Sequence, residues 1–145
     1  MLKICEKYNV MMKAHNTDYL SDEALSWHPK LGIHAANVAP EFGVTESKAL
    51  IKILSENGLK NLSNSFIELA YKSRKWQKWL KPNSSADVLQ KAIISGHYIF
   101  STKEFKKIKN LAIFELEKKG IDLDNYLKGE IKKCILRYLN NFRLI

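Results

Sequence analysis

The sequence lacks any apolar run close to the ~20 residues that a membrane-spanning helix requires. The opening segment, residues 1–8, is too polar to be the apolar stretch of a signal peptide. Only two cysteines are present, Cys5 and Cys134, near opposite ends of the chain and without metal-binding or redox spacing. These absences predict reduced thiols, a cytoplasmic location and no contact with a membrane.

Acidic residues are also scarce, with 15 Asp and Glu against 24 Lys and Arg, which gives a net charge of +9. Between Glu68 and Asp87 the chain has no acid but five bases: Lys72, Arg74, Lys75, Lys78 and Lys81. Trp76 and Trp79 stand among them, and basic residues mixed with aromatics can bind nucleic acid, phosphate-bearing ligands or a partner. An amphipathic turn that buries the tryptophans explains the pattern equally well. Because lysine greatly outnumbers arginine, we favour a solvated surface and expect no nucleic-acid binding.

Two short apolar runs predict strands that are buried on both faces. Val10–Ala14 ends at a polar cluster, and Gly32–Ala36 ends at Asn37. A short helix is expected between them, capped by Ser21 and closed by Pro29, and another helix is expected after Thr45. Strands that alternate with helices pair in parallel. Two such strands cannot make a covered sheet alone, so their neighbours must come from a missing part of the chain or from another polypeptide.

Polar side chains stand where the two predicted strands end, which is where ligands bind in parallel α/β folds. His15 and Asp18 are candidates for acid–base catalysis or metal contacts, and Asn16, Thr17 and Asn37 are candidates for ligand binding. Asn, Thr and Asp are also common at the starts of loops, where they cap the backbone. His15 favours the functional interpretation, because turn chemistry does not require it.

Two weaker candidates lie further along. His34 falls inside the second run and shares a face with Ala36, so it is either a ligand contact or a packed core histidine. The backbone amides of Gly43, Val44 and Thr45 lie at the expected helix start, and helix N-termini bind phosphate. No glycine-rich signature accompanies them, and no spacing identifies a metal.

The segment Lys13–Tyr19, Lys-Ala-His-Asn-Thr-Asp-Tyr, resembles the Glu-Ala-His-Ser-Thr-Asp-Tyr segment near the end of the class II tagatose-bisphosphate aldolase accessory subunits. The order of the elements that follow is similar, and so are the stretches Lys75–Trp79 and Ser85–Tyr98. The resemblance covers most of this chain but only about the last third of the family's length. Ile33–Pro40 departs from it, because family members have a Lys-Val-Gly-Pro-Ala type of strand there.

The resemblance implies an α/β fold, namely the C-terminal portion of a TIM (β/α)₈ barrel. Its last two strands, the seventh and eighth, and their helices would occupy residues 1–60, and a C-terminal helical extension would occupy residues 61–145. The chain would then be a fragment.

The resemblance also implies the function of a sugar-phosphate aldolase accessory subunit, of the tagatose- or fructose-bisphosphate type, in carbohydrate metabolism. The expected partners are a sugar phosphate and either the catalytic aldolase subunit or the missing N-terminal barrel part. Any zinc would belong to that aldolase or to the intact barrel. Because the relatives are non-catalytic, it stays open whether the protein is itself a lyase-related enzyme. The alternative is a helical protein–protein interaction module without ligand chemistry.

Overall fold

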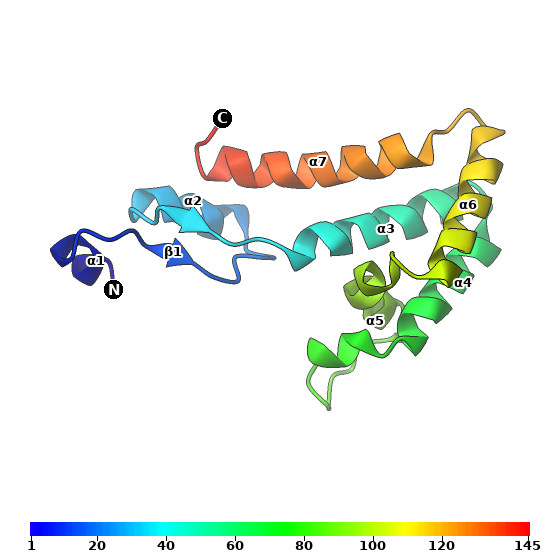
Figure 1. Cartoon of the computed structure of the whole chain (residues 1–145), viewed down its shortest axis with the longest axis horizontal. Helices are drawn as coiled ribbons and strands as arrows, with labels where there is room; N and C mark the ends of the chain where they lie inside the picture. The colour runs from blue at the N-terminus through cyan, green and yellow to red at the C-terminus, as the bar shows by residue number, and fades with distance from the viewer. The chain divides into compact units, whose positions relative to one another are not determined.

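The computed structural model describes all 145 residues, and helices, including two short 3-10 helices, account for 66% of them (Figure 1). The only sheet has two strands. In chain order the elements are α1 Leu2–Lys7, β1 Lys13–Ala14, α2 Asp22–Lys30, β2 Ala35–Ala36, α3 Pro40–Glu56, α4 Lys60–Lys72, η1 Lys75–Lys78, α5 Val88–Ser95, η2 Gly96–Ile99, α6 Lys103–Glu117 and α7 Leu123–Asn141. No helix combines the length and the apolar character that a membrane crossing requires.

The prediction that the chain is the C-terminal portion of a (β/α)₈ barrel is wrong. The expected parallel pairing is confirmed, with Lys13 opposite Ala35 and Ala14 opposite Ala36, but each strand has only two residues and one neighbour. Val10 and Met11, at the start of the first apolar run, are 55% and 81% exposed. Apolar composition predicted burial there, but nothing in the chain supplies the covering layer that would turn the run into a buried strand.

The chain divides into two compact units. We call residues 1–42 and 132–145 the strand unit, and residues 43–131 the helical unit. Helices α3 and α7 each begin in one unit and end in the other. The predicted division between residues 60 and 61 therefore falls inside the helical unit.

The helical unit holds the hydrophobic core. Phe66 on α4 is fully buried, with its ring stacked against Phe100 and edge-on to Phe105. A Cβ added to Gly96, the first residue of η2, would come within 2.7 Å of the Phe66 ring, so only glycine fits at this position. The rest of the core comes from α3, α4, α5, η2, α6 and α7, namely Ala49, Leu50, Ile53, Leu54, Ala70, Ala92, Ile99, Ala112, Leu116, Leu123 and Leu127.

The strand unit buries far less. Its fully covered residues are Thr17, Leu25 and Tyr138. Helix α2 starts as the sequence predicted, because the Ser21 hydroxyl accepts a hydrogen bond from Ala24 N–H, 3.1 Å away. Since burial of apolar surface is the main stabilising contribution to folding, this unit has little of its own to hold it together.

Candidate functional site

The polar segment after β1 lies beside the segment after β2, as parallel strands require. Thr17 N–H donates to the carbonyl oxygen of Asn37 at 3.1 Å, and the Thr17 hydroxyl donates to the same oxygen at 2.7 Å. Asn37 N–H in turn donates to the carbonyl oxygen of Ala14 at 3.0 Å. Thr17 is buried, so its side chain holds the two segments together, whereas His15 and Asn16 are exposed.

Asp18 stabilises the start of α3. One of its carboxylate oxygens, Oδ1, accepts hydrogen bonds from Ala39 N–H at 3.0 Å and from Glu41 N–H at 2.9 Å. Because α3 begins at Pro40, these amides belong to the group of N–H donors that have no partner within the helix. Asp18, a candidate catalytic residue, is therefore engaged in the backbone structure of the strand unit.

The candidate phosphate-binding amides do not lie at a helix start. The prediction that the helix begins near Thr45 is wrong, since α3 begins at Pro40 and contains Gly43, Val44 and Thr45. Within a helix the amides bond to carbonyl oxygens four residues earlier, so they are not available to an anion. The true N-terminus of α3 already has an anionic partner in the Asp18 carboxylate.

His34 lies at the other end of the strand pair from Asn37. The ring Nδ1 of His34 accepts a hydrogen bond from Met12 N–H at 3.2 Å, and the backbone N–H of His34 donates to the carbonyl oxygen of Met12 at 2.9 Å. The ring thus extends the pairing between the strands at their N-terminal ends. The structure does not bring His34 together with the cluster from His15 to Asp18.

Glu41 is the centre of a hydrogen-bond network that sequence reasoning missed. Its Oε2 accepts hydrogen bonds from the Tyr138 hydroxyl and from Tyr19 N–H. The Tyr138 oxygen also lies 3.3 Å from the carbonyl oxygen of Thr17. The network thus ties the segment after β1 to the start of α3 and to the part of α7 that belongs to the strand unit.

Arg137, beside Tyr138 on α7, joins the same network. Its Nε donates to Asp22 Oδ1 at 2.7 Å, its Nη1 lies 3.4 Å from Glu41 Oε1, and its Nη2 donates to the carbonyl oxygen of Leu20. The guanidinium fork therefore bridges the first turn of α2 and the first turn of α3. No local sequence pattern predicts these partners, because they lie about a hundred residues from Arg137 in the chain.

Two members of this network, Tyr138 and Arg137, hold their protons more tightly than usual. Burial and the hydrogen bond to Glu41 raise the pKa of Tyr138, so its hydroxyl keeps its proton. Burial lowers the pKa of Arg137, but its hydrogen bond to Asp22 and the charges of Asp22 and Glu41 outweigh that effect, and its pKa is raised. Neither group is poised to exchange a proton, so the network acts as a structural clamp and not as acid–base machinery.

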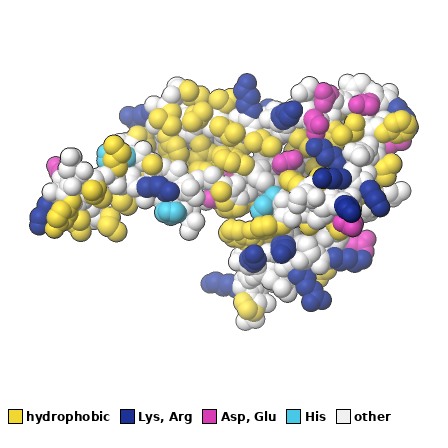
Figure 2. All heavy atoms as spheres, viewed as in Figure 1, with side chains coloured by type: hydrophobic (Ala, Val, Ile, Leu, Met, Phe, Trp, Pro, Cys, Tyr) yellow, Lys and Arg dark blue, Asp and Glu magenta, His cyan; other side chains and the backbone are white.

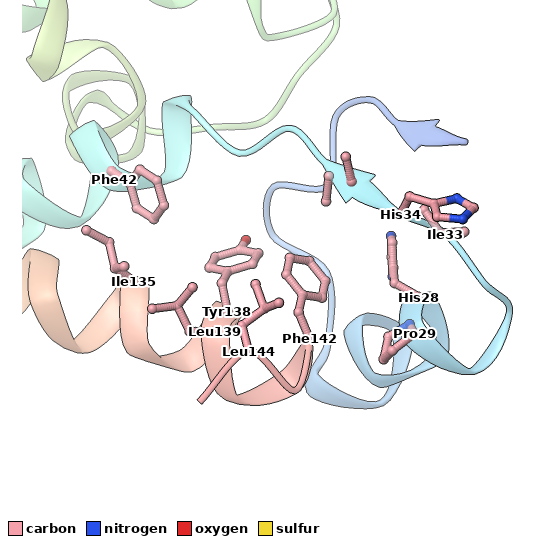
Figure 3. A pocket seen from close by; sticks show the side chains of 12 residues that line it. His28, Pro29, Ile33, His34, Phe42, Ile135, Tyr138, Leu139, Phe142 and Leu144 are labelled. Carbon is pink, nitrogen blue, oxygen red and sulfur yellow. The ribbon is translucent and has the colours of Figure 1, made fainter. Parts of the chain in front are cut away.

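An apolar groove of about 420 Å³ lies in the strand unit, between α2, β2 and the last turns of α7 (Figure 3). Its lining includes His28, Pro29, Ile33, Tyr138, Phe142 and Leu144. Both contacts of His28 Nδ1 are carbonyl oxygens of its own helix, 3.2 Å away. A groove of this composition does not suit a phosphate, which requires cations or several N–H donors.

No three side chains of His, Cys, Asp or Glu converge in a way that could hold a metal ion. The two cysteines are partly buried and neither is in a disulfide bond. Comparison with family models, with curated proteins and with solved structures found no match. The family resemblance of Lys13–Tyr19 therefore stays a prediction.

Glu46, on the part of α3 in the helical unit, is an unfavourably buried acid. Burial raises its pKa from the ordinary value of 4.5, Lys109 partly offsets this, and Asp124 adds to it. An acid whose pKa is raised by folding favours the folded state most below pH ~4.5 and loses that contribution as the pH rises. We expect Glu46→Gln to raise Tm at pH 7 and to match the wild-type Tm below pH 4, as thermal unfolding at the two pH values can measure. Exposed Glu56→Gln is the control, and a Glu46→Gln protein that is less stable than wild type at pH 7 would contradict the prediction.

Proposed function

We propose that this chain is a non-catalytic accessory component of a sugar-phosphate aldolase, of the tagatose- or fructose-bisphosphate type, and that it contacts the catalytic subunit through the strand unit. The observation that carries the proposal concerns Lys13–Tyr19, the segment in which the family resemblance is best. Within it Thr17 and Asp18 organise the strand ends, and His15 and Asn16 are left exposed for a ligand or a partner.

The absence of a catalytic assembly in this geometry favours the accessory role over chemistry of its own. A general base needs a partner that orients it, and a catalytic carboxylate needs to be available to substrate. Asp18 is bonded to two backbone amides, and Glu41 is bonded to Tyr138 and Arg137. His15 is exposed and has no hydrogen-bond partner in the chain.

The exposed surface of the strand unit supports contact with a partner. Its two-stranded sheet has an open edge on each side, and sheets of two strands are marginally stable alone. Large apolar side chains are exposed around it, which marks an interaction surface: Met1, Ile4, Tyr8, Val10, Met11, Trp27 and Leu31. Figure 2 shows hydrophobic side chains at the surface around α1, at the left of the view.

The proposal can be tested by mixing the chain with a catalytic tagatose-bisphosphate aldolase subunit. Size-exclusion chromatography and calorimetry measure their association, and the half-life of aldolase activity measures whether the chain stabilises the enzyme. We expect a stable complex and a longer half-life. Val10→Asp with Met11→Asp should weaken binding at least tenfold, because two desolvated carboxylates would face the partner. Leu111→Asp with Phe114→Asp is the matched control, since these helical-unit side chains are 55% and 58% exposed. Equal loss in both double variants, or none in the first, would contradict the proposed interface.

The alternative function, a protein–protein interaction module without ligand chemistry, is favoured by the same exposed surface. The accessory role and the interaction module predict different responses of the complex to sugar phosphate. If His15 and Asn16 contact ligand, tagatose 1,6-bisphosphate should strengthen the complex, and His15→Ala with Asn16→Ala should remove that effect. A complex whose affinity is the same with and without the sugar phosphate would favour the module.

A further inference from the structure

A second hollow, in the helical unit, combines an indole ring with lysine side chains. It has a volume of about 370 Å³ and lies between η1, the turn after it and α5. Trp76, Gln77, Lys81, Ser84 and Lys91 are among the residues that line it. None of them belongs to the strand unit, so the inference that follows does not depend on the proposed function.

The Trp76 ring is held rigidly. Its Nε1 donates to the carbonyl oxygen of Tyr71 at 3.0 Å, and its ring is nearly parallel to the Tyr71 ring, with 5.8 Å between the centroids. The backbone at Arg74, with φ of 56°, ends α4 and turns the chain into η1. A fixed aromatic face loses little entropy when a ligand ring packs on it.

Lys91 is a half-buried cation without an anion. Its Nζ lies 4.8 Å from the centroid of the Trp76 ring, and no carboxylate pairs with it. The contact with the aromatic ring offsets part of the cost of burying the ammonium. An anion bound next to the Lys91 ammonium would stabilise it further.

The surroundings of the hollow have an excess of positive charge that the chain does not neutralise. Figure 2 shows Lys and Arg side chains gathered over the part of the view where α4 and α5 lie in Figure 1. Lys72 pairs with Glu68, but four other bases have no ion pair: Arg74, Lys75, Lys78 and Lys81. The next acid along the chain, Asp87, accepts a hydrogen bond from Gln90 N–H at 2.7 Å and caps α5. An anion that enters the hollow therefore meets several cations and no nearby carboxylate in this stretch of chain.

We propose that this hollow binds a small phosphate ester, with its phosphate paired to Lys81 and Lys91 and its ring against the indole of Trp76. Gln77 and Ser84 supply polar groups within reach of hydroxyls on that ring. The volume suits a small molecule. A polymer would need a row of stacking platforms, whereas Trp76 is the only aromatic residue among those that line the hollow. Phosphorylated sugars and nucleotides share the required chemistry.

Calorimetry and tryptophan fluorescence of the full chain at low salt test the proposal. The titrants are fructose 1,6-bisphosphate, AMP, inorganic phosphate and fructose. We expect saturable binding of at least one ester, at least tenfold weaker binding of phosphate, and no binding of fructose. The ester that binds more tightly identifies the source as a sugar phosphate or a nucleotide.

Charge variants assign the binding to this hollow. Lys81→Gln with Lys91→Gln should lower the affinity for the ester at least tenfold, and Lys103→Gln with Lys106→Gln, the same change of charge at exposed positions of α6, should not. Absence of ester binding, or equal affinity in the two variants, would overturn the proposal. Binding of phosphate as tight as that of the ester would overturn the role of the indole. No aldolase is present in these titrations, so their failure is separable from failure of the proposed function.

Discussion

Replacing Phe66 with alanine should lower the free energy of unfolding of the helical unit by about 3–5 kcal/mol. The side chain is fully buried and contacts the rings of Phe100 and Phe105, so its removal leaves a cavity that three helical segments cannot easily close. A loss of this size is comparable with the whole stability of a small domain. Urea denaturation followed by far-UV circular dichroism measures it.

Phe114→Ala is the matched control for this change. It removes the same atoms from a ring on α6 that is 58% exposed, and we expect a loss below about 1 kcal/mol. If the two variants unfold at the same urea concentration, the core is not organised around Phe66.

Replacing Glu41 with alanine should destabilise the strand unit by about 3 kcal/mol, because it removes at once an acceptor of the Tyr138 hydroxyl and the acid of a partly buried ion pair. The Tyr138 hydroxyl keeps only the carbonyl oxygen of Thr17 as an acceptor, and Arg137 keeps only Asp22 as its acidic partner. Amide hydrogen exchange can follow each unit separately. We expect protection of the Leu25 amide, in α2, to fall by about a hundredfold and that of the Phe66 amide to stay unchanged.

The control for Glu41 is Glu23→Ala, an exposed acid in the first turn of α2. It should lose only its favourable interaction with the helix dipole, about 0.5 kcal/mol. Equal exchange at Leu25 in the two variants would show that the Glu41 network does not hold the strand unit together.

Local chemistry accounts for the parts of the fold that the sequence could predict. The start of α2 follows from the Ser21 side chain, which can reach an amide three residues away. The helical character of residues 61–145 follows from apolar spacing. Parallel pairing of the two apolar runs follows from the helix between them.

The parts that the sequence could not predict depend on contacts between distant residues. The sequence predicts the start of α3 near Thr45, yet the helix begins at Pro40, where Asp18, more than twenty residues earlier in the chain, bonds to the backbone amides. The role of Glu41 depends on Arg137 and Tyr138 in the same way. Neither pairing leaves a periodic or compositional signal. The barrel prediction was wrong for a related reason, since an apolar run shows that burial is favourable but not whether a second layer exists.

The strand unit is built from both ends of the chain, and this affects how it forms during protein synthesis. Its clamp joins Asp22 to Arg137 and Thr17 to Tyr138, which are separated by 115 and 121 residues. A ribosome that adds about 10 residues per second makes Tyr138 on the order of 10 s after Thr17. Residues 1–42 therefore leave the ribosome before the α7 residues that complete their unit have been made. During that interval the exposed apolar segment around α1 is a binding site for chaperones, and pausing translation after residue 131 should lengthen its exposure.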